Sequence, residues 1–268
     1  MTELLWMRMT APELREAAAR DAIVILPVAS LEQHGPHLAT GTDMVLGAAV
    51  AEAVAERLHA AGQPVVVLPV VWHGLAEHHM AFGGTITLDQ PSFHALLKGI
   101  GASVARAGFK RLFLLNAHGG NAEAIGIAVN EIGRDTGLAC MGGTYWHIVP
   151  GAIAPLLEDQ PMLMHACEAE TSLMLHLSPA SVRQEKLPEA VGPASSRLPG
   201  QPPGLHVKRS FAAITRSGVI GDARRASAAK GAALLDAIAQ ELAQLLADPA
   251  LWASAARSAA PDRAAGEG

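Results

Sequence analysis

The sequence has little cysteine, no block of basic residues and no long apolar run. Two cysteines, Cys140 and Cys167, are too few among 268 residues for a disulfide framework, and they fit buried small side chains in a reducing compartment. A net charge of -5 without a Lys/Arg cluster argues against nucleic acid or an anionic membrane as a partner. No stretch approaches the roughly 18 apolar residues of a membrane span. We therefore expect a cytoplasmic protein that acts on a small molecule.

What is abundant is apolar sequence, which makes up 50% of the chain and can bury a sizeable core. Continuous apolar runs predict strands over residues 22–28, 64–71, 111–115 and 138–141, and helical patterns fill residues 11–20, 43–59, 91–108 and 122–136. A final helix would place Leu235, Ile238, Leu242 and Leu245 on one face. This alternation predicts an α/β fold with three α/β/α layers, in which helices cover both faces of a largely parallel sheet.

We expect one domain over residues 1–250 and a flexible tail over residues 251–268. Within the domain, residues 188–204 are rich in Pro, Gly, Ser and Ala and show little periodicity. A loop of that length is either a functional cover or a disordered segment. A flap over the site is therefore one of the two interpretations.

Acids and histidines follow four of the predicted strands. Because ligands of open α/β sheets bind beyond the carboxyl ends of the strands, these side chains should meet at one rim. A further cluster lies in the segment HACEAETS. The residues are Glu32, His34 and Asp43 after the first strand, Glu77, His78 and His79 after the second, His118 after the third, Trp146 and His147 after the fourth, and His165, Glu168 and Glu170 in the cluster.

The loop after the first strand has the composition of a metal site. In extended chain, Glu32 and His34 point the same way, and Asp43 returns to them across a glycine-bearing loop. Carboxylates and imidazoles without a thiolate suit Zn, Mn or Fe in a redox-neutral role. Two ions would need a bridging carboxylate, for which Asp43 is the candidate. The alternative is a polar loop that caps the next helix, with Asp43 placed for the helix dipole.

The segment NAHGGN suggests a substrate-binding turn. Its glycines, Gly119 and Gly120, let the backbone approach a substrate, and free N–H groups at a helix start can bind developing negative charge. The alternative is a glycine-rich turn capped by Asn121. In the later cluster, Glu168 and Glu170 are two residues apart, so they cannot point alike on a helix but could do so in extended chain.

Five segments resemble the creatininase family in the right order along nearly the whole chain. SLEQHGPHLATGTD is similar to the family signature S-[TL]-E-Q-H-G-P-H-L-P-x-x-T-D, and FGGTITL, NAHGGN and HACEAETSLML resemble its next three elements. GVIGDARRASAAKG resembles the segment that opens the last helix. The resemblance implies a creatininase-like α/β/α fold, two divalent metal ions, amidohydrolase chemistry and a homo-oligomer, often a hexamer.

The resemblance also implies roles for individual residues. Glu32, His34, Asp43 and His118 would be metal ligands, with Asp43 bridging, and His165 would handle the proton. Creatininase has a glutamate ligand where this chain has Gly120, so Glu170 is our first choice for the vacant position and Glu168 our second. The substrate-binding candidates are Trp146, Gly119, Gly120, Asn121 and His78.

The expected reaction is hydrolysis of a cyclic amide or formamide C–N bond by hydroxide activated by two metal ions, with Zn as the first choice and Mn or Fe as alternatives. Pro161 to Met164 provide no counterpart of the second tryptophan that creatininase closes over its substrate, which weakens specificity for creatinine. The remaining alternatives are a peptide-trimming member, a lactone or C–C hydrolase, and a non-catalytic small-molecule binder on the same fold.

Overall fold

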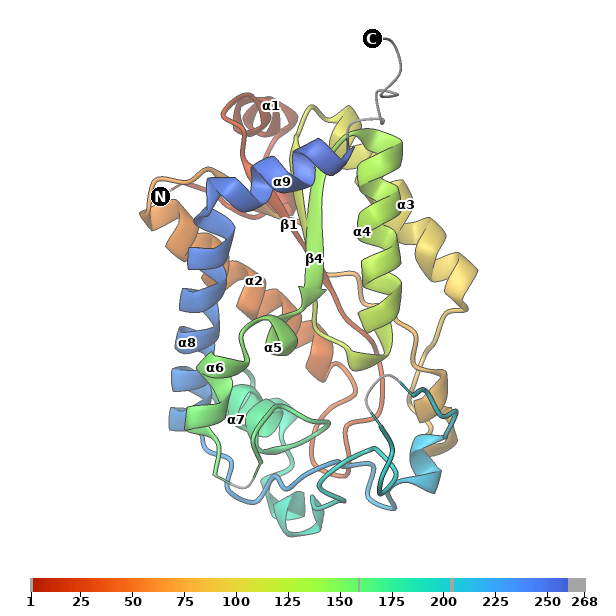
Figure 1. Ribbon diagram of the computed structural model, residues 1–268. Helices are drawn as coiled ribbons and strands as arrows, with labels where there is room; N and C mark the ends of the chain where they lie inside the picture. Colours follow the sequence, from red (N-terminus) through yellow and green to blue (C-terminus); the bar gives the residue numbers. More distant parts are fainter. Residues whose placement is uncertain (1, 159, 203–204, 260–268) are drawn as a thin grey trace.

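A four-stranded parallel sheet lies at the centre of the protein (Figure 1). The computed structural model describes residues 2–158, 160–202 and 205–259. The strands run in the order β2-β1-β3-β4, and every neighbouring pair is parallel. Their bounds are β1 Ile23–Val28, β2 Val65–Val67, β3 Arg111–Asn116 and β4 Ala139–Thr144. The predicted fold class is confirmed.

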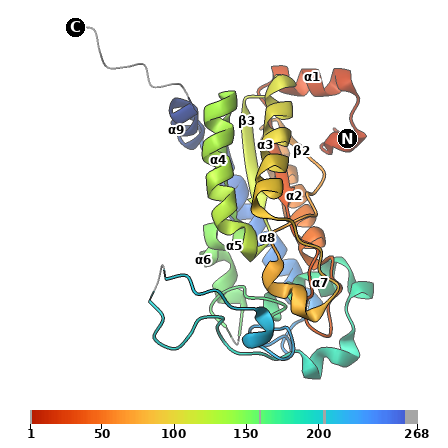
Figure 2. The same ribbon diagram turned by 90° about the vertical axis from the view of Figure 1, so that its right-hand side faces the viewer.

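Alternate residues of the strands enter two separate cores, one on each face of the sheet. In β1, Ile23 and Ile25 belong to one core, and Val24 and Leu26 belong to the other. A strand covered on both faces needs apolar residues at every position, which explains the continuous apolar runs. The first core packs on α2 Thr42–Ala60, α7 Glu168–Leu177 and α8 Ala228–Ala247, and the second on α1 Ala11–Ala19, α3 Gln90–Arg106 and α4 Ala122–Thr136. Figure 2 views the sheet from the side of α3 and α4, with α2 and α8 behind it.

Several short helices complete the secondary structure of the described ranges. The α-helical ones are α5 Tyr145–Ile148 and α6 Pro150–Ile153. The 3-10 helices are η1 Trp6–Arg8, η2 Glu77–Phe82, η3 Gly119–Asn121, η4 Ala154–Leu156, η5 Pro179–Ser181, η6 Gln184–Glu189 and η7 Phe211–Ala213. No helix in the described ranges is both long and apolar enough to cross a bilayer.

The second strand is shorter than the predicted range 64–71. β2 ends at Val67, and pairing with the first strand returns only as a single bridge between Val71 and Val28. Pro69 lies between, and its nitrogen has no hydrogen to donate to the ladder. The predicted final helix is α8, in which Ile238 and Leu242 are buried as predicted, whereas Leu245 is 37% exposed and Leu246 is buried instead.

The C-terminal segment differs from the predicted flexible tail of residues 251–268. Helix α9 covers Pro249–Ala259, and Trp252 within it is 4% exposed. The indole Nε1–H donates to the Leu246 carbonyl oxygen at 2.7 Å, and the Arg111 guanidinium lies 5.7 Å from the ring centre. Burial of this large side chain stabilises the helix against fraying, so the prediction is wrong up to residue 259. Residues 260–268 lie outside the described ranges.

Candidate metal centre

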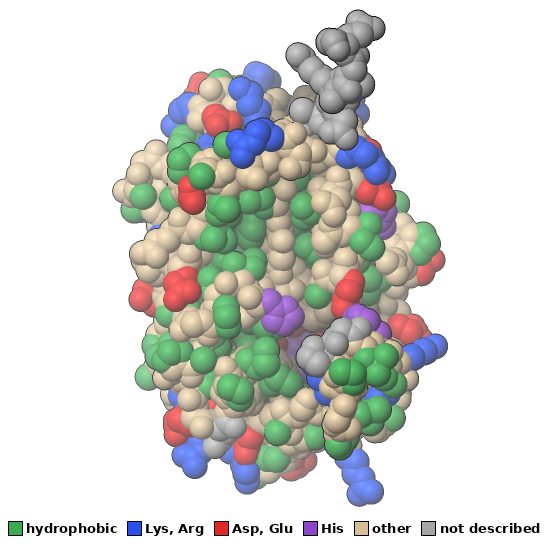
Figure 3. Space-filling model, viewed as in Figure 1, with side chains coloured by type: hydrophobic (Ala, Val, Ile, Leu, Met, Phe, Trp, Pro, Cys, Tyr) green, Lys and Arg blue, Asp and Glu red, His purple; other side chains and the backbone are tan. Residues whose placement is uncertain are grey.

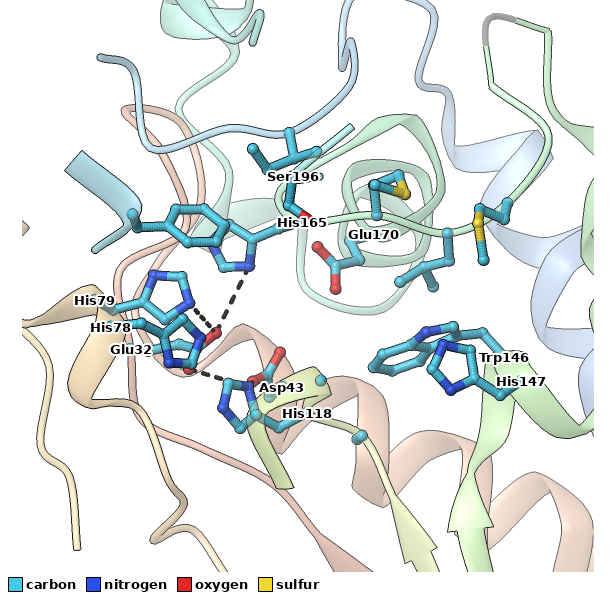
Figure 4. A pocket seen from close by; sticks show the side chains of 18 of the residues that line it. Glu32, Asp43, His78, His79, His118, Trp146, His147, His165, Glu170 and Ser196 are labelled. Carbon is cyan, nitrogen blue, oxygen red and sulfur yellow. Dashed lines mark ion pairs between the residues drawn. The ribbon is translucent and has the colours of Figure 1, made fainter. Parts of the chain in front are cut away.

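The carboxyl ends of the strands bring most of the predicted acids and histidines to one cavity (Figure 4). Glu32 follows β1, Asp43 lies in the first turn of α2, and His118 follows β3, while Glu170 comes from the first turn of α7. The cavity has a volume of about 530 Å³. Histidine side chains gather on the surface just beyond the end of β4 (Figure 3). The parallel sheet therefore creates the rim that the sequence predicted.

Glu32, Asp43 and His118 form the first group of candidate ligands. His118 Nε2 lies 3.2 Å from the Leu75 carbonyl oxygen, to which it can only donate. Its Nδ1 in the neutral ring then carries no hydrogen, yet it faces Glu32 Oε2 at 3.0 Å and Asp43 Oδ2 at 3.3 Å. Three electron-pair donors thus point at one another.

His34, Asp43 and Glu170 form the second group in the same way. His34 Nδ1 donates to the Glu32 carbonyl oxygen at 3.1 Å. The other ring nitrogen, Nε2, faces Asp43 Oδ1 at 3.1 Å and Glu170 Oε2 at 3.9 Å. The two groups share Asp43, each of whose carboxylate oxygens faces one of them.

The donor set fits divalent cations. Glu32 Oε2, His34 Nε2 and Asp43 Oδ2 are buried and make no hydrogen bond, which is costly unless another partner is bound. Within each group the ligand atoms lie within 4.8 Å of one another, close enough for all to reach an ion at about 2 Å. A third combination, Glu32, His34 and His165, meets the same criterion.

The charges of the cluster lead to the same conclusion. Burial lowers the pKa of His34, but the negative charges of Asp43, Glu170 and Glu32 outweigh it and raise that pKa to about 10. Burial is the main cause that raises the pKa of Glu170 to about 8, and Asp43 and Glu32 add to it. The carboxylates therefore require positive charge beside them, which either a proton on each imidazole or a bound cation supplies.

Two residues that sequence reasoning did not assign to the site, Gln33 and His79, orient Glu32. Gln33 Oε1 accepts from the Gly35 N–H at 2.9 Å, so its amide nitrogen is the atom that donates to the Gly218 carbonyl oxygen at 3.2 Å and to His79 Nδ1 at 2.8 Å. His79 Nε2 then carries the hydrogen and faces Glu32 Oε1 at 3.2 Å. Such hydrogen bonds hold a ligating carboxylate in place. His79 was placed at the rim by the sequence, but only His78 was chosen from that loop.

His165 presents one ring nitrogen to the cavity. Its Nε2 lies 2.9 Å from the Gln33 carbonyl oxygen, to which it can only donate. The unprotonated Nδ1 lies 3.6 Å from Glu32 Oε1. Burial, together with the positive charges of His34, His79 and His118, lowers the pKa of His165 well below its usual value. The ring therefore stays neutral, with an unprotonated Nδ1 beside the cluster.

Glu168 does not join the cluster. It lies on the same helix as Glu170, where two residues of separation turn the side chains away from each other. Glu168 accepts from the Glu158 backbone N–H at 3.1 Å and pairs with Lys230, whose side chain is 12% exposed. The structure thus places the second-choice ligand in a buried ion pair and the first choice, Glu170, beside His34.

Four of the five substrate-binding candidates, His78, Gly119, Gly120 and Trp146, line the cavity. The fifth, Asn121, does not: its side chain accepts from the Leu75 N–H at 2.9 Å and donates to the Ala29 carbonyl oxygen at 3.0 Å. Both amide ends are used to hold the loop after β1 against the loop after β2. The Asn121 side chain therefore connects two loops and lies outside the cavity lining, so its contact with substrate stays a prediction.

Gly120, the position at which creatininase has a glutamate, has no room for a side chain. An added Cβ would lie 2.3 Å from the Leu75 carbonyl oxygen and 2.5 Å from His118 Nε2. We expect Gly120→Ala to displace His118, to weaken metal binding about tenfold or more, and to cost about 2 kcal/mol of unfolding free energy. Gly119→Ala is the matched control, because its Cβ would meet only Trp146 Cζ2, at 4.0 Å.

Metal titration and thermal unfolding of both variants test this expectation. Equal metal affinity and equal Tm in the two variants would show that the loop accommodates a methyl group at residue 120, against the distances above.

The chain matches one family model, creatininase (creatinine amidohydrolase), over residues 7–246. Among curated proteins, a mycofactocin precursor peptide peptidase of Mycobacterium tuberculosis (strain CDC 1551 / Oshkosh) is 34% identical over 243 residues, which covers 84% of this chain and 86% of the relative. The creatinine amidohydrolase of Pseudomonas putida is 30% identical over 264 residues, with 91% and 94% covered.

Solved creatininase structures share the fold. The structure described as "Creatininase Mn" superimposes with a TM-score of 0.75 at 29% identity, and the match covers 91% of this chain and 98% of that one. A Zn–Zn form of a creatininase variant superimposes with a TM-score of 0.73 at 29% identity, with 92% and 98% covered. The solved structures that share this fold thus include a manganese form and a zinc form.

Proposed function

The chain belongs to the creatininase family of hydrolases, and from that premise we propose that it is an amidohydrolase that uses two divalent metal ions to cleave a C–N bond. The observation that carries the proposal is the pair of ligand groups that share Asp43. One group is Glu32, Asp43 and His118, and the other is His34, Asp43 and Glu170. The choice of Glu170 explains how the chain can dispense with a glutamate at residue 120.

Divalent ions held there would activate a water molecule and polarise the oxygen of the scissile carbonyl group. His165 Nδ1, free of hydrogen and 3.6 Å from Glu32 Oε1, would take the proton that the water gives up and pass it to the departing nitrogen. The backbone at Gly119 and Gly120 borders the cavity just before α4, where N–H groups can stabilise negative charge on the carbonyl oxygen. Hydrogen bonds to Gln33 would hold the rings of His79 and His165 in position.

The scissile bond can be the cyclic amide or formamide that the sequence suggested, or a peptide bond. The peptide bond is favoured by the mycofactocin peptidase relatives, which are 34–35% identical, and by the room in the cavity. A volume of about 530 Å³ falls within the roughly 300–1,000 Å³ typical of sites for drug-sized ligands. A lactone or C–C bond would need the same cluster and a different pocket.

Metal analysis combined with a hydrolysis screen tests the proposal. We expect about two Zn or Mn ions per chain after reconstitution, and metal-dependent release of amine or formate from at least one of a panel of cyclic amides, formamides and short peptides. A protein that holds no stoichiometric metal would contradict the metal centre. A metal-loaded protein that binds panel members without releasing product would support the non-catalytic binder instead.

A further inference from the structure

A second cavity of about 390 Å³ adjoins the cavity of the metal cluster. Six residues line both, so the two form one continuous space that opens away from the cluster. The shared residues are His78, Gly119, Gly120, Ser196, Arg197 and Phe211. Ser196 and Arg197 come from the predicted loop of residues 188–204, which therefore borders the site.

Two arginines that line this second cavity, Arg197 and Arg209, make no ion pair with the described part of the chain. No carboxylate of the described ranges lies within 4.0 Å of the guanidinium of Arg197 or Arg209. Arg209 donates to the carbonyl oxygens of Ser196 at 3.4 Å and Ala213 at 3.1 Å, which leaves most of its five N–H donors free. Like charges on neighbouring side chains repel each other unless an anion lies between them.

The acid that lines the second cavity is already faced by a base. Glu123 Oε1 lies 4.0 Å from His206 Nδ1, and both side chains are at least 70% exposed. Solvent therefore screens Glu123 strongly. Two arginines thus stand against one acid among the charged side chains of the wall.

We propose that Arg197, supported by Arg209, binds a carboxylate of the substrate at a distance from the bond that is cleaved. The proposal rests on the proposed function, because the scissile amide must lie at the cluster of Glu32 and Asp43. A planar guanidinium matches a carboxylate with two parallel hydrogen bonds. The substrate would accordingly be an acyl amino acid or a short peptide with a free carboxyl end.

Apolar side chains form part of the wall of the continuous space. Met162, Met164 and Phe211 line the main cavity, and Phe211 also lines the second one. A single small ring such as creatinine would leave this wall and both arginines uncovered. An extended substrate would contact the cluster, the apolar wall and the arginines at once.

Binding of N-acetyl-leucine and of N-acetyl-leucinamide to the metal-loaded protein, measured by calorimetry, separates the charged end from the rest of the ligand. We expect the acid to bind about tenfold more tightly than the amide, as charged hydrogen bonds allow, and less tightly at high salt. Arg197→Ala should remove this preference, and Arg197→Lys should keep part of it. Arg216→Ala is the matched control, since Arg216 is exposed and lines neither cavity.

The outcomes separate this proposal from the proposed function. Equal binding of acid and amide, or a preference that survives in Arg197→Ala, would overturn the carboxylate site, because the acid would then lie elsewhere, for example at the cluster. A preference that depends on Arg197 in a protein that cleaves no amide would support the carboxylate site and contradict amide hydrolysis. Cleavage of acetylated dipeptides with equal kcat/KM for carboxylate and carboxamide ends would support amide hydrolysis and contradict the carboxylate site.

Discussion

Replacing Asp43 by alanine is expected to reduce the metal content from about two ions per chain to none and to lower kcat/KM by about 10³-fold or more. Each carboxylate oxygen faces one ligand group, Oδ1 toward His34 at 3.1 Å and Oδ2 toward His118 at 3.3 Å. Removal of the side chain therefore leaves each ion with two ligands. Loss of a single oxyanion donor already costs about 10²–10³ in rate, so loss of both ions should cost more.

Asp89→Ala provides the matched control for the alternative role of Asp43 at a helix start. Asp89 is the N-cap of α3 and accepts from the Ser92 N–H at 2.9 Å, whereas α2 has Gly41 as its N-cap and no side-chain cap. Asp89→Ala should cost about 1 kcal/mol of unfolding free energy and leave the metal content unchanged. If Asp43→Ala behaves in the same way, with two ions retained, Asp43 acts only on the helix dipole.

Replacing Glu170 and Glu168 by glutamine is expected to have opposite effects. Glu170→Gln removes a charge that lies 3.9 Å from His34, and it should weaken metal binding at the second group by more than the roughly 10–100-fold seen for residues that only orient a ligand. The metal-free protein should not lose stability, because burial and the negative charges of Asp43 and Glu32 already raise the pKa of Glu170 to about 8. One ion per chain and a large loss of kcat are the expected readings.

Glu168→Gln should instead spare the metal and lower stability. The carboxylate is fully buried and pairs with Lys230, and removal of one partner of a buried pair leaves the other uncompensated. Because Lys230 keeps Glu158 at 2.8 Å, we expect a loss of about 2 kcal/mol, or a decrease in Tm of about 5 °C. Metal analysis and thermal unfolding of the two variants decide the assignment, and a loss of metal in Glu168→Gln alone would reverse it.

Much of the candidate site could be predicted because local sequence patterns mark the strand ends and helix starts at which its residues lie. Glu32, His34, Asp43 and His118 all lie where a buried strand ends or a helix starts, and parallel strands bring such positions to one edge. The apolar runs of β1 and β3 could be recognised because both faces are covered. The tail was mispredicted because Trp252 finds its contacts on α8 and the sheet, which the local composition of residues 251–259 does not reveal.

The sequence by itself determined the fold class, the family and the candidate ligands Glu32, His34, Asp43 and His118, because these depend on periodicity and on short motifs within single segments. Only the tertiary structure showed that Glu170, and not Glu168, lies beside the other candidate ligands, because the helix turns the two side chains to different sides. It also decided the positions of Gln33 and His165, which lie 132 residues apart in the chain and are joined by the hydrogen bond from His165 Nε2 to the Gln33 carbonyl oxygen at 2.9 Å. Such contacts join segments that lie far apart in the sequence and that no local periodicity relates. Their partners are therefore set only when the chain packs into its tertiary structure.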